Sequence, residues 1–230
     1  MYNHIFFDLD RTLWDFEKNS HEVLSELYQK YYLINRGITD SNYFIERYKY
    51  HNEKLWDLYR KNKIEKDKLR DERFRVTLEE FGLKDNELAF NLGNDYVEHC
   101  PMKTNLFPFV HSTLNYLKDR YTLHVITNGF EEVQYKKLEN SSLIDYFEQI
   151  ITSEQVGFKK PSNEIFNFSL LKAFAKPSNS LMIGDDLQAD IIGAQDFGMA
   201  QVYFNPLKEE HSTANITHEI SCLSELEAIL

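Results

Sequence analysis

The sequence predicts an α/β protein whose core is a parallel sheet, with an α-helical domain inserted after the first strand. Over residues 107–230, short apolar runs alternate with helix-like segments, which is typical of right-handed βαβ units and a parallel sheet. Over residues 17–100, apolar residues recur at helical spacing and no strand pattern is present, which indicates a helical bundle. The predicted domains are therefore an α/β core of residues 1–16 and 101–230 and a helical cap of residues 17–100.

The first predicted strand is the apolar run of residues 5–7, which ends in Asp8 and Asp10. A strand covered on both faces reads as a continuous apolar run, and ligands bind beyond the carboxyl ends of such strands. Because side chains two apart lie on the same side of an extended chain, the two carboxylates should converge. They then repel each other unless a cation compensates, and a divalent metal is the simplest compensation. The alternative is that both acids only end the strand and open a turn.

The cap is predicted to contain four helices. Asn19 or Ser20 is expected to cap the first and Ser41 the second. Gly82 fits the end of the third helix, and a fourth begins near Asn86. The many Tyr, Lys and Glu residues of this segment fit a small bundle with a wide solvated face.

The rest of the chain supplies the other strands of the sheet and the helices that cover it. The expected elements are a helix at 110–117, a strand at 121–126, a helix at 133–138, a strand at 149–152, a helix at 165–170, a strand at 180–183, a helix at 190–194, a strand at 200–204, and a weaker strand and helix after 218.

Composition excludes several classes of function. A net charge of −11 over 230 residues argues against a nucleic-acid-binding surface, which needs a basic face. Cys100 and Cys222 are too few for a disulfide framework or a thiolate metal site. The first residues have no basic flank, so no signal peptide is predicted, and no apolar run is long enough to span a membrane. We therefore expect a cytoplasmic monomer or homodimer whose partner is a small molecule.

Three further strand ends carry polar side chains. Thr127 and Asn128 present a hydroxyl and an amide at a helix start, which suits an anion, although such a turn can simply cap the helix. Lys160 precedes Pro161, which restricts the residue before it; alone, such a lysine is usually at the surface. The last strand end adds three more acids, Asp185, Asp186 and Asp190. Several acids and one lysine at the same sheet edge need both a cation and an anion to balance their charges.

These four groups, in this order, resemble the four motifs of the haloacid dehalogenase superfamily of aspartate-nucleophile phosphohydrolases: Asp8-Leu9-Asp10-Arg11-Thr12, Thr127-Asn128, Lys160-Pro161 and Gly184-Asp185-Asp186. The resemblance covers essentially the whole chain. It implies a Rossmann-like core with a helical cap inserted after the first motif. Residues 9–17 resemble the nucleotidase branch, which includes pyrimidine 5′-nucleotidases.

The resemblance implies a role for each matching residue. Asp8 is expected to attack phosphorus in line and form an aspartyl-phosphate. Asp10 is expected to protonate the leaving alkoxide and then to take a proton from the attacking water. Mg²⁺ is the implied cofactor, with the Asp8 carboxylate, the Asp10 backbone carbonyl and Asp185 as its ligands.

The other matching residues are expected to handle phosphate charge. Thr127, Asn128 and Lys160 would bind the substrate phosphate and stabilise charge on its oxygens, with Lys160 counted as catalytic. Asp186 and Asp190 are second-tier candidates. Asp186 stands where many relatives have a small polar residue, which leaves its contact with the metal open, and Asp190 is expected to orient Lys160 or the waters of the metal.

The predicted function is Mg²⁺-dependent phosphomonoester hydrolysis, with nucleoside 5′-monophosphates, pyrimidine ones first, as substrates. A sugar phosphate or phosphoglycolate phosphatase is the alternative. Trp14 and Phe16 are specificity candidates, because they follow the nucleophile by a few residues and aromatic rings stack on bases. Several cap rings either contact the substrate or form the core of the cap: Tyr48, Tyr50, Trp56 and Tyr59.

Three other readings use the same residues differently. A dehalogenase lacks the acid that corresponds to Asp10 and needs no metal, so the presence of Asp10 argues against it. A phosphonatase needs a lysine from the cap, for which Lys49 and Lys54 are the candidates, although such lysines are usually solvated. A non-catalytic phospho-ligand binding protein should have lost one of the key residues, and none is lost.

Overall fold

The computed structural model describes residues 2–212 and 215–230, and the chain divides into two compact units. The core unit comprises Met1–Phe16 and Thr104–Leu230, and the cap unit comprises Glu17–Lys103. The cap unit ends three residues beyond the boundary predicted from the sequence, because a 3₁₀ turn, η2 (Cys100–Met102), directly follows the last cap helix.

In the described residues, six parallel strands form one sheet in the order β3-β2-β1-β4-β5-β6. The central strand β1 pairs with β2 on one side and with β4 on the other. The strand order therefore reverses beside β1, and the crevice at such a switch point is where open α/β sheets bind ligands. The strands are β1 (His4–Phe7), β2 (Thr122–Thr127), β3 (Gln149–Thr152), β4 (Ser180–Gly184), β5 (Ala200–Phe204) and β6 (His218–Ile220).

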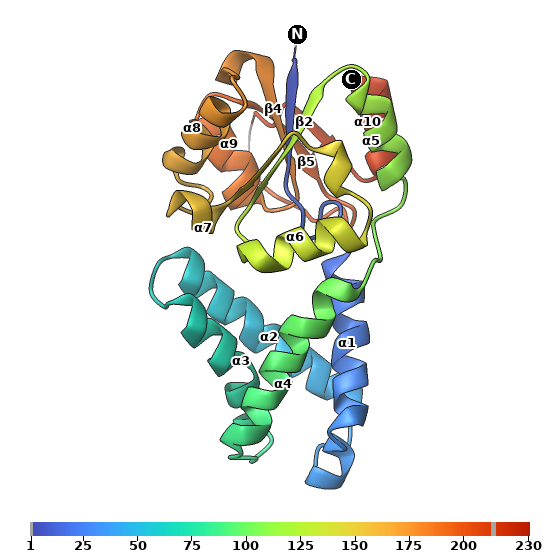
Figure 1. Ribbon diagram of the computed structural model, residues 1–230, viewed down its shortest axis with the longest axis vertical. Helices are drawn as coiled ribbons and strands as arrows, with labels where there is room; N and C mark the ends of the chain where they lie inside the picture. Colours follow the sequence, from blue (N-terminus) through green and yellow to red (C-terminus); the bar gives the residue numbers. More distant parts are fainter. Residues whose placement is uncertain (1, 213–214) are drawn as a thin grey trace. The chain divides into compact units, whose positions relative to one another are not determined.

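Helices cover both faces of this sheet: α8 and α9 lie on one side, and α5 and α10 on the other (Figure 1). Phe6, Ile126 and Met182, from three adjacent strands, are buried against Ile165 and Phe166 of α8. The α/β fold with a parallel sheet, predicted from the sequence, is confirmed. The core helices are α5 (Val110–Lys118), α6 (Glu131–Asn140), α7 (Ser153–Val156), α8 (Asn163–Lys172), α9 (Gly193–Asp196) and α10 (Leu226–Ile229), with 3₁₀ turns η3 (Ile144–Tyr146), η4 (Pro177–Asn179) and η6 (Leu223–Glu225).

Two core elements differ from the prediction. The short helix α7 lies between the strand expected at 149–152 and the helix expected at 165–170, where no element was predicted. The helix predicted at 190–194 begins earlier, as the π-helical turn η5 (Leu187–Ile192), and continues as α9. Apolar periodicity does not reveal a π turn, and such turns are frequent at functional sites.

The cap unit consists of α1 (Phe16–Lys30), η1 (Leu33–Arg36), α2 (Ser41–Arg60), α3 (Lys66–Glu80) and α4 (Asn86–His99). Two cap predictions are wrong. Asn19 and Ser20 lie buried inside α1, where Ser20 accepts a hydrogen bond from Tyr96. The N-cap of α2 is Asp40, whose carboxylate accepts from the backbone N–H groups of residues 42 and 43.

The cap has its own aromatic core. The ring of Tyr48 is fully buried and lies 4.5 Å from that of Phe74 and 5.4 Å from that of Tyr96. Tyr59 is also buried and packs edge-on against Trp56. These rings therefore stabilise the cap itself. None of the described helices has the length and apolar character needed to cross a membrane.

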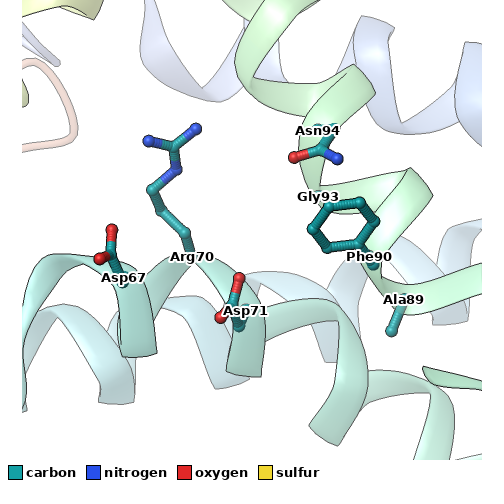
Figure 2. Close-up of a pocket in the computed structure, with 7 residues that line it drawn as sticks. All are labelled: Asp67, Arg70, Asp71, Ala89, Phe90, Gly93 and Asn94. Atoms are coloured by element: carbon teal, nitrogen blue, oxygen red, sulfur yellow. The ribbon is translucent and has the colours of Figure 1, made fainter. Parts of the chain in front are cut away.

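A cavity of about 220 Å³ lies between α3 and α4. Figure 2 shows its charged side chains on α3 and its apolar and amide side chains on α4. It contains none of the site residues predicted from the sequence. Its lining residues are Asp67, Arg70, Asp71, Ala89, Phe90, Gly93 and Asn94.

Candidate active site

The centre of the site is a buried ion-pair cluster at the carboxyl ends of β1 and β4. Asp8 follows β1 directly, and its Oδ1 lies 2.6 Å from Nζ of Lys160. The same ammonium lies 2.6 Å from Oδ1 of Asp190 and donates to the carbonyl of Ile126 at 2.8 Å. Three oxygen atoms thus surround the ammonium group: two accept its hydrogen bonds, and that of Asp190 forms an ion pair with it. The lysine is 2% exposed, so it is part of the site rather than of the surface.

Burial and charge together set the protonation behaviour of this cluster. Burial raises the pKa of Asp8, and the Lys160 ammonium opposes that shift. Burial also raises the pKa of Asp190 to about 7, again against Lys160. Burial alone would lower the pKa of Lys160, but Asp190 and Asp8 outweigh it and raise that pKa overall. The ammonium is therefore charged and holds the two acids together.

Asp185 follows β4 and brings another carboxylate to the same place. Its Oδ1 accepts a 3.0 Å hydrogen bond from the hydroxyl of Thr12. Burial, with repulsion from Asp8 and Asp190, raises its pKa well above the ordinary value. Oxygen atoms of Asp8, Asp185 and Asp190 lie within 4.8 Å of one another. Such oxygen donors with excess negative charge fit a hard divalent cation.

Gly184 lets Asp190 reach this cluster. A Cβ atom at Gly184 would lie 2.2 Å from Oδ2 of Asp190, so a larger residue would displace that carboxylate. Oδ2 of Asp190 also accepts from the backbone N–H of Asp186 at 3.1 Å. The Asp186 carboxylate itself caps η5 by accepting from the backbone N–H groups of Gln188 and Ala189.

Asp10 lies in the turn after β1 and bonds to helix α6. Its Oδ1 is 2.6 Å from Nζ of Lys137, and its Oδ2 accepts from Nε2 of Gln134 at 2.8 Å. Gln134 Nε2 also lies 2.7 Å from Oγ1 of Thr127. Gln134 and Lys137 were not predicted from the sequence; their only signal was the i, i+3 spacing on a helix that follows a polar strand end.

Asn128 bonds to the backbone of Lys160. Its Oδ1 accepts from the Lys160 N–H at 2.8 Å, and its Nδ2 donates to the Lys160 carbonyl at 3.0 Å. The side-chain amide thus holds the loop that carries the lysine. Asn128 lies at the strand end expected from the sequence, and it links that strand end to the loop of Lys160.

The two aromatic specificity candidates differ in burial. The Trp14 ring is fully buried, and Lys137 Nζ lies 4.4 Å from its centroid. Phe16 is half-buried, with the Arg11 guanidinium 4.7 Å from its ring. Of the two residues, only Phe16 is partly exposed.

The two cap lysines have local partners. Lys49 pairs with Glu17 at 2.7 Å, and Lys54 donates to the Tyr50 hydroxyl. Both lysines and their partners belong to the cap unit, where such pairs at the surface are ordinary.

Comparisons with known proteins agree with this geometry. A model of the haloacid dehalogenase-like hydrolase family matches residues 5–204. YfnB of Bacillus subtilis, described as a HAD-hydrolase, is 32% identical over 232 residues, which covers 100% of this chain and 95% of YfnB. A crystal structure of YfnB bound to magnesium superposes with a TM-score of 0.89 at 30% identity, over 99% of this chain and 98% of that one.

Two further relatives have named substrates. The pyrimidine 5′-nucleotidase YjjG of Escherichia coli is 31% identical over 98% of this chain and 96% of YjjG. The glyceraldehyde 3-phosphate phosphatase of Methanothermobacter thermautotrophicus is 30% identical over 87% of this chain and 84% of that enzyme. Both names are consistent with the predicted phosphatase activity. Together with the family match, these full-length similarities show that the chain belongs to the haloacid dehalogenase-like hydrolase family.

Proposed function

We propose that this hydrolase is a Mg²⁺-dependent phosphomonoesterase that acts through an aspartyl-phosphate. One observation carries the proposal: Asp8 lies buried at the strand switch point, 2.6 Å from Lys160, beside the acid Asp185. A carboxylate in that crevice is placed to attack a bound phosphoryl group, while the lysine offsets the charge of the phosphoryl oxygens.

The chemistry proceeds in two displacements. In the first, an Asp8 oxygen bonds to phosphorus as the ester P–O bond breaks, and the leaving oxygen takes a proton from Asp10. In the second, water attacks phosphorus, Asp10 takes a proton from it, and the Asp8–phosphorus bond breaks to release phosphate. Because three oxygen atoms already surround the ammonium of Lys160, the ammonium must exchange one of them for a phosphoryl oxygen.

The acid cluster is the proposed magnesium site. Asp8, Asp185 and the backbone carbonyl of Asp10 would hold the ion, and Asp190 would instead keep Lys160 in place, since it forms an ion pair with that lysine. When bound, Mg²⁺ supplies charge neutralisation between the carboxylates and the phosphoryl oxygens. Asp186 is not needed as a ligand, because its carboxylate caps η5.

The proposed substrates are nucleoside 5′-monophosphates, pyrimidine ones first. The similarity to a pyrimidine 5′-nucleotidase over nearly the full length of both chains supports this class. Phe16, with Arg11 against its ring, is the proposed contact for a base. A sugar phosphate phosphatase is the second candidate, favoured by the similarity to a glyceraldehyde 3-phosphate phosphatase.

The test of the reaction is turnover of 4-nitrophenyl phosphate with Mg²⁺, with a chelator, and with Mg²⁺ restored. Activity should vanish in chelator and return with the metal. Asp8→Asn should remove both turnover and the acid-stable phosphoenzyme trapped by rapid quenching. Full activity in chelator, or a phosphoenzyme in the Asp8 variant, would contradict the proposal.

The test of the substrate class is kcat/KM across nucleoside monophosphates, sugar phosphates and phosphoglycolate. We expect pyrimidine nucleotides to rank first. A preference of tenfold or more for a sugar phosphate, which is about 1.4 kcal/mol of transition-state binding, would overturn the nucleotidase assignment and leave the phosphatase assignment standing.

A further inference from the structure

Helix α6 holds both oxygens of the Asp10 carboxylate. Lys137 Nζ lies 2.6 Å from Oδ1, and Gln134 Nε2 donates to Oδ2 at 2.8 Å. The two residues are three apart on α6, so they share one face of the helix. Both are buried, and Gln134 has no exposed surface. A carboxylate held at both oxygens has little freedom to rotate.

Two neighbouring features keep these anchors in place. Lys137 Nζ lies 4.4 Å from the centroid of the buried Trp14 ring, which suits a cation–π contact. A Cβ atom at Gly129 would lie 2.3 Å from Gln134 Nε2, so Gln134 needs a glycine at that position. The carboxylate of Asp10 is thus held by residues of α6, and residues of the turns after β1 and β2 keep those residues in place.

We propose that Lys137 and Gln134 are positioning residues for Asp10, and that Trp14 acts through Lys137 rather than by stacking on a base. This proposal rests on the proposed function. Each carboxylate oxygen has two lone-pair sites, and α6 occupies one on each oxygen. The Asp10 side chain is 25% exposed while that of Lys137 is 5% exposed, so Asp10 is the more accessible of the two.

The proposal predicts which step of the reaction depends on Lys137. Proton transfer from Asp10 to the leaving oxygen matters for a nucleoside, which is a poor leaving group, and matters little for 4-nitrophenolate. Removal of the phosphoryl group from Asp8 requires Asp10 as the base with either substrate. Lys137 should therefore affect nucleotide cleavage and phosphoenzyme hydrolysis, and spare phosphorylation by the aryl ester.

The experiment is rapid-quench kinetics of Lys137→Met with uridine 5′-monophosphate and with 4-nitrophenyl phosphate, both with Mg²⁺. We expect kcat for the nucleotide to fall by about 10- to 100-fold, a part of the usual contribution of a positioned acid, with KM within about threefold. With the aryl ester, the burst of 4-nitrophenolate should keep its rate, and phosphoenzyme should accumulate because its hydrolysis is slow.

Three variants sharpen the result. Lys137→Arg should recover most of the nucleotide activity, Trp14→Ala should show the same burst pattern in milder form, and Lys136→Met, an exposed neighbour on α6, should behave as wild type. An equal loss of burst rate and nucleotide turnover in Lys137→Met, or a change confined to KM, would overturn the positioning role. If the wild-type enzyme forms no phosphoenzyme with either ester, the proposed function itself has failed.

Discussion

Residues without functional groups determine much of this site, and Gly184 shows how. Asp190 reaches Lys160 because residue 184 has no side chain that would occupy the place of its carboxylate. The space left open is smaller than one methyl group, since an added Cβ would lie 2.2 Å from the Asp190 carboxylate. A glycine that ends a buried strand is read from the sequence as a turn. That it leaves space for the carboxylate of Asp190, six residues further along the chain, becomes visible only in three dimensions.

Gly184→Ala should displace Asp190 and disturb its ion pair with Lys160. We expect a loss of kcat of tenfold or more and a loss of about 1 to 3 kcal/mol in the free energy of unfolding, as for other overpacked sites. Steady-state kinetics and urea unfolding measure the two effects. Gly93→Ala is the control, because a Cβ there meets only ordinary contacts and should leave activity unchanged. Wild-type kinetics in Gly184→Ala would show that the position of Asp190 does not matter.

Secondary-structure elements were predicted well where their signal is local. The apolar runs predicted the strands, and Asp8 and Asp185, which directly follow β1 and β4, lie close together because all parallel strands of this sheet end at one edge. Lys160 instead lies in the loop between α7 and α8. Prediction from the sequence was wrong or incomplete where a contact with a residue distant in the chain determines the role of a side chain. Ser20 reads as an N-cap, but Tyr96 from α4 buries it inside α1. From the sequence, Lys137 resembles any other lysine on a helix, because no neighbouring residue indicates its contact with Asp10.

The acids that follow β1 and β4 lead to a prediction about metal binding. Asp8 and Asp185 repel each other in the folded protein, and an ion bound only to the folded state stabilises it. Mg²⁺ should therefore raise the melting temperature of the wild type. Asp185→Asn should melt at a higher temperature than the wild type without Mg²⁺, because one repelled carboxylate is gone, and should respond weakly to the metal.

Thermal unfolding with and without Mg²⁺ measures this effect, and Asp119→Asn, an exposed acid at the end of α5, serves as the control. An Asp185→Asn variant that is less stable than the wild type without metal would contradict the repulsion argument.

At the scale of the whole molecule, stability should depend on a buried histidine that takes no part in the proposed chemistry. His124 on β2 is fully buried, with its ring 4.6 Å from that of Phe6 and its Nε2 3.2 Å from Nδ1 of His4. Burial, with a smaller contribution from His4, lowers the pKa of His124 to about 4. In the unfolded chain this pKa is about 6.5. The unfolded state therefore binds the proton first as the pH falls.

The contribution of His124 to the free energy of unfolding should thus be fully present above pH 6.5. It should fall by up to about 3 kcal/mol as the pH drops from 6.5 toward 4. His124→Leu should lack this component, so the difference in stability between wild type and variant should shrink or change sign between pH 7 and pH 4. Urea unfolding at several pH values measures that difference. His21→Leu, at an exposed cap position, should show none of it, and a pH-independent difference for His124→Leu would contradict the assignment.

The central position of β1 has a consequence for the order in which the protein is made. Asp8 leaves the ribosome early, but β1 must wait for β2 and β4 before it has neighbours. Lys160 follows Asp8 by 152 residues, which takes roughly 8 to 30 s at ordinary rates of synthesis. The cap helices, the last of which ends at His99, are synthesised well before then. A nascent chain that ends before β4 therefore offers its first strand only one of its two neighbours, β2, and it still lacks Asp185 and Asp190.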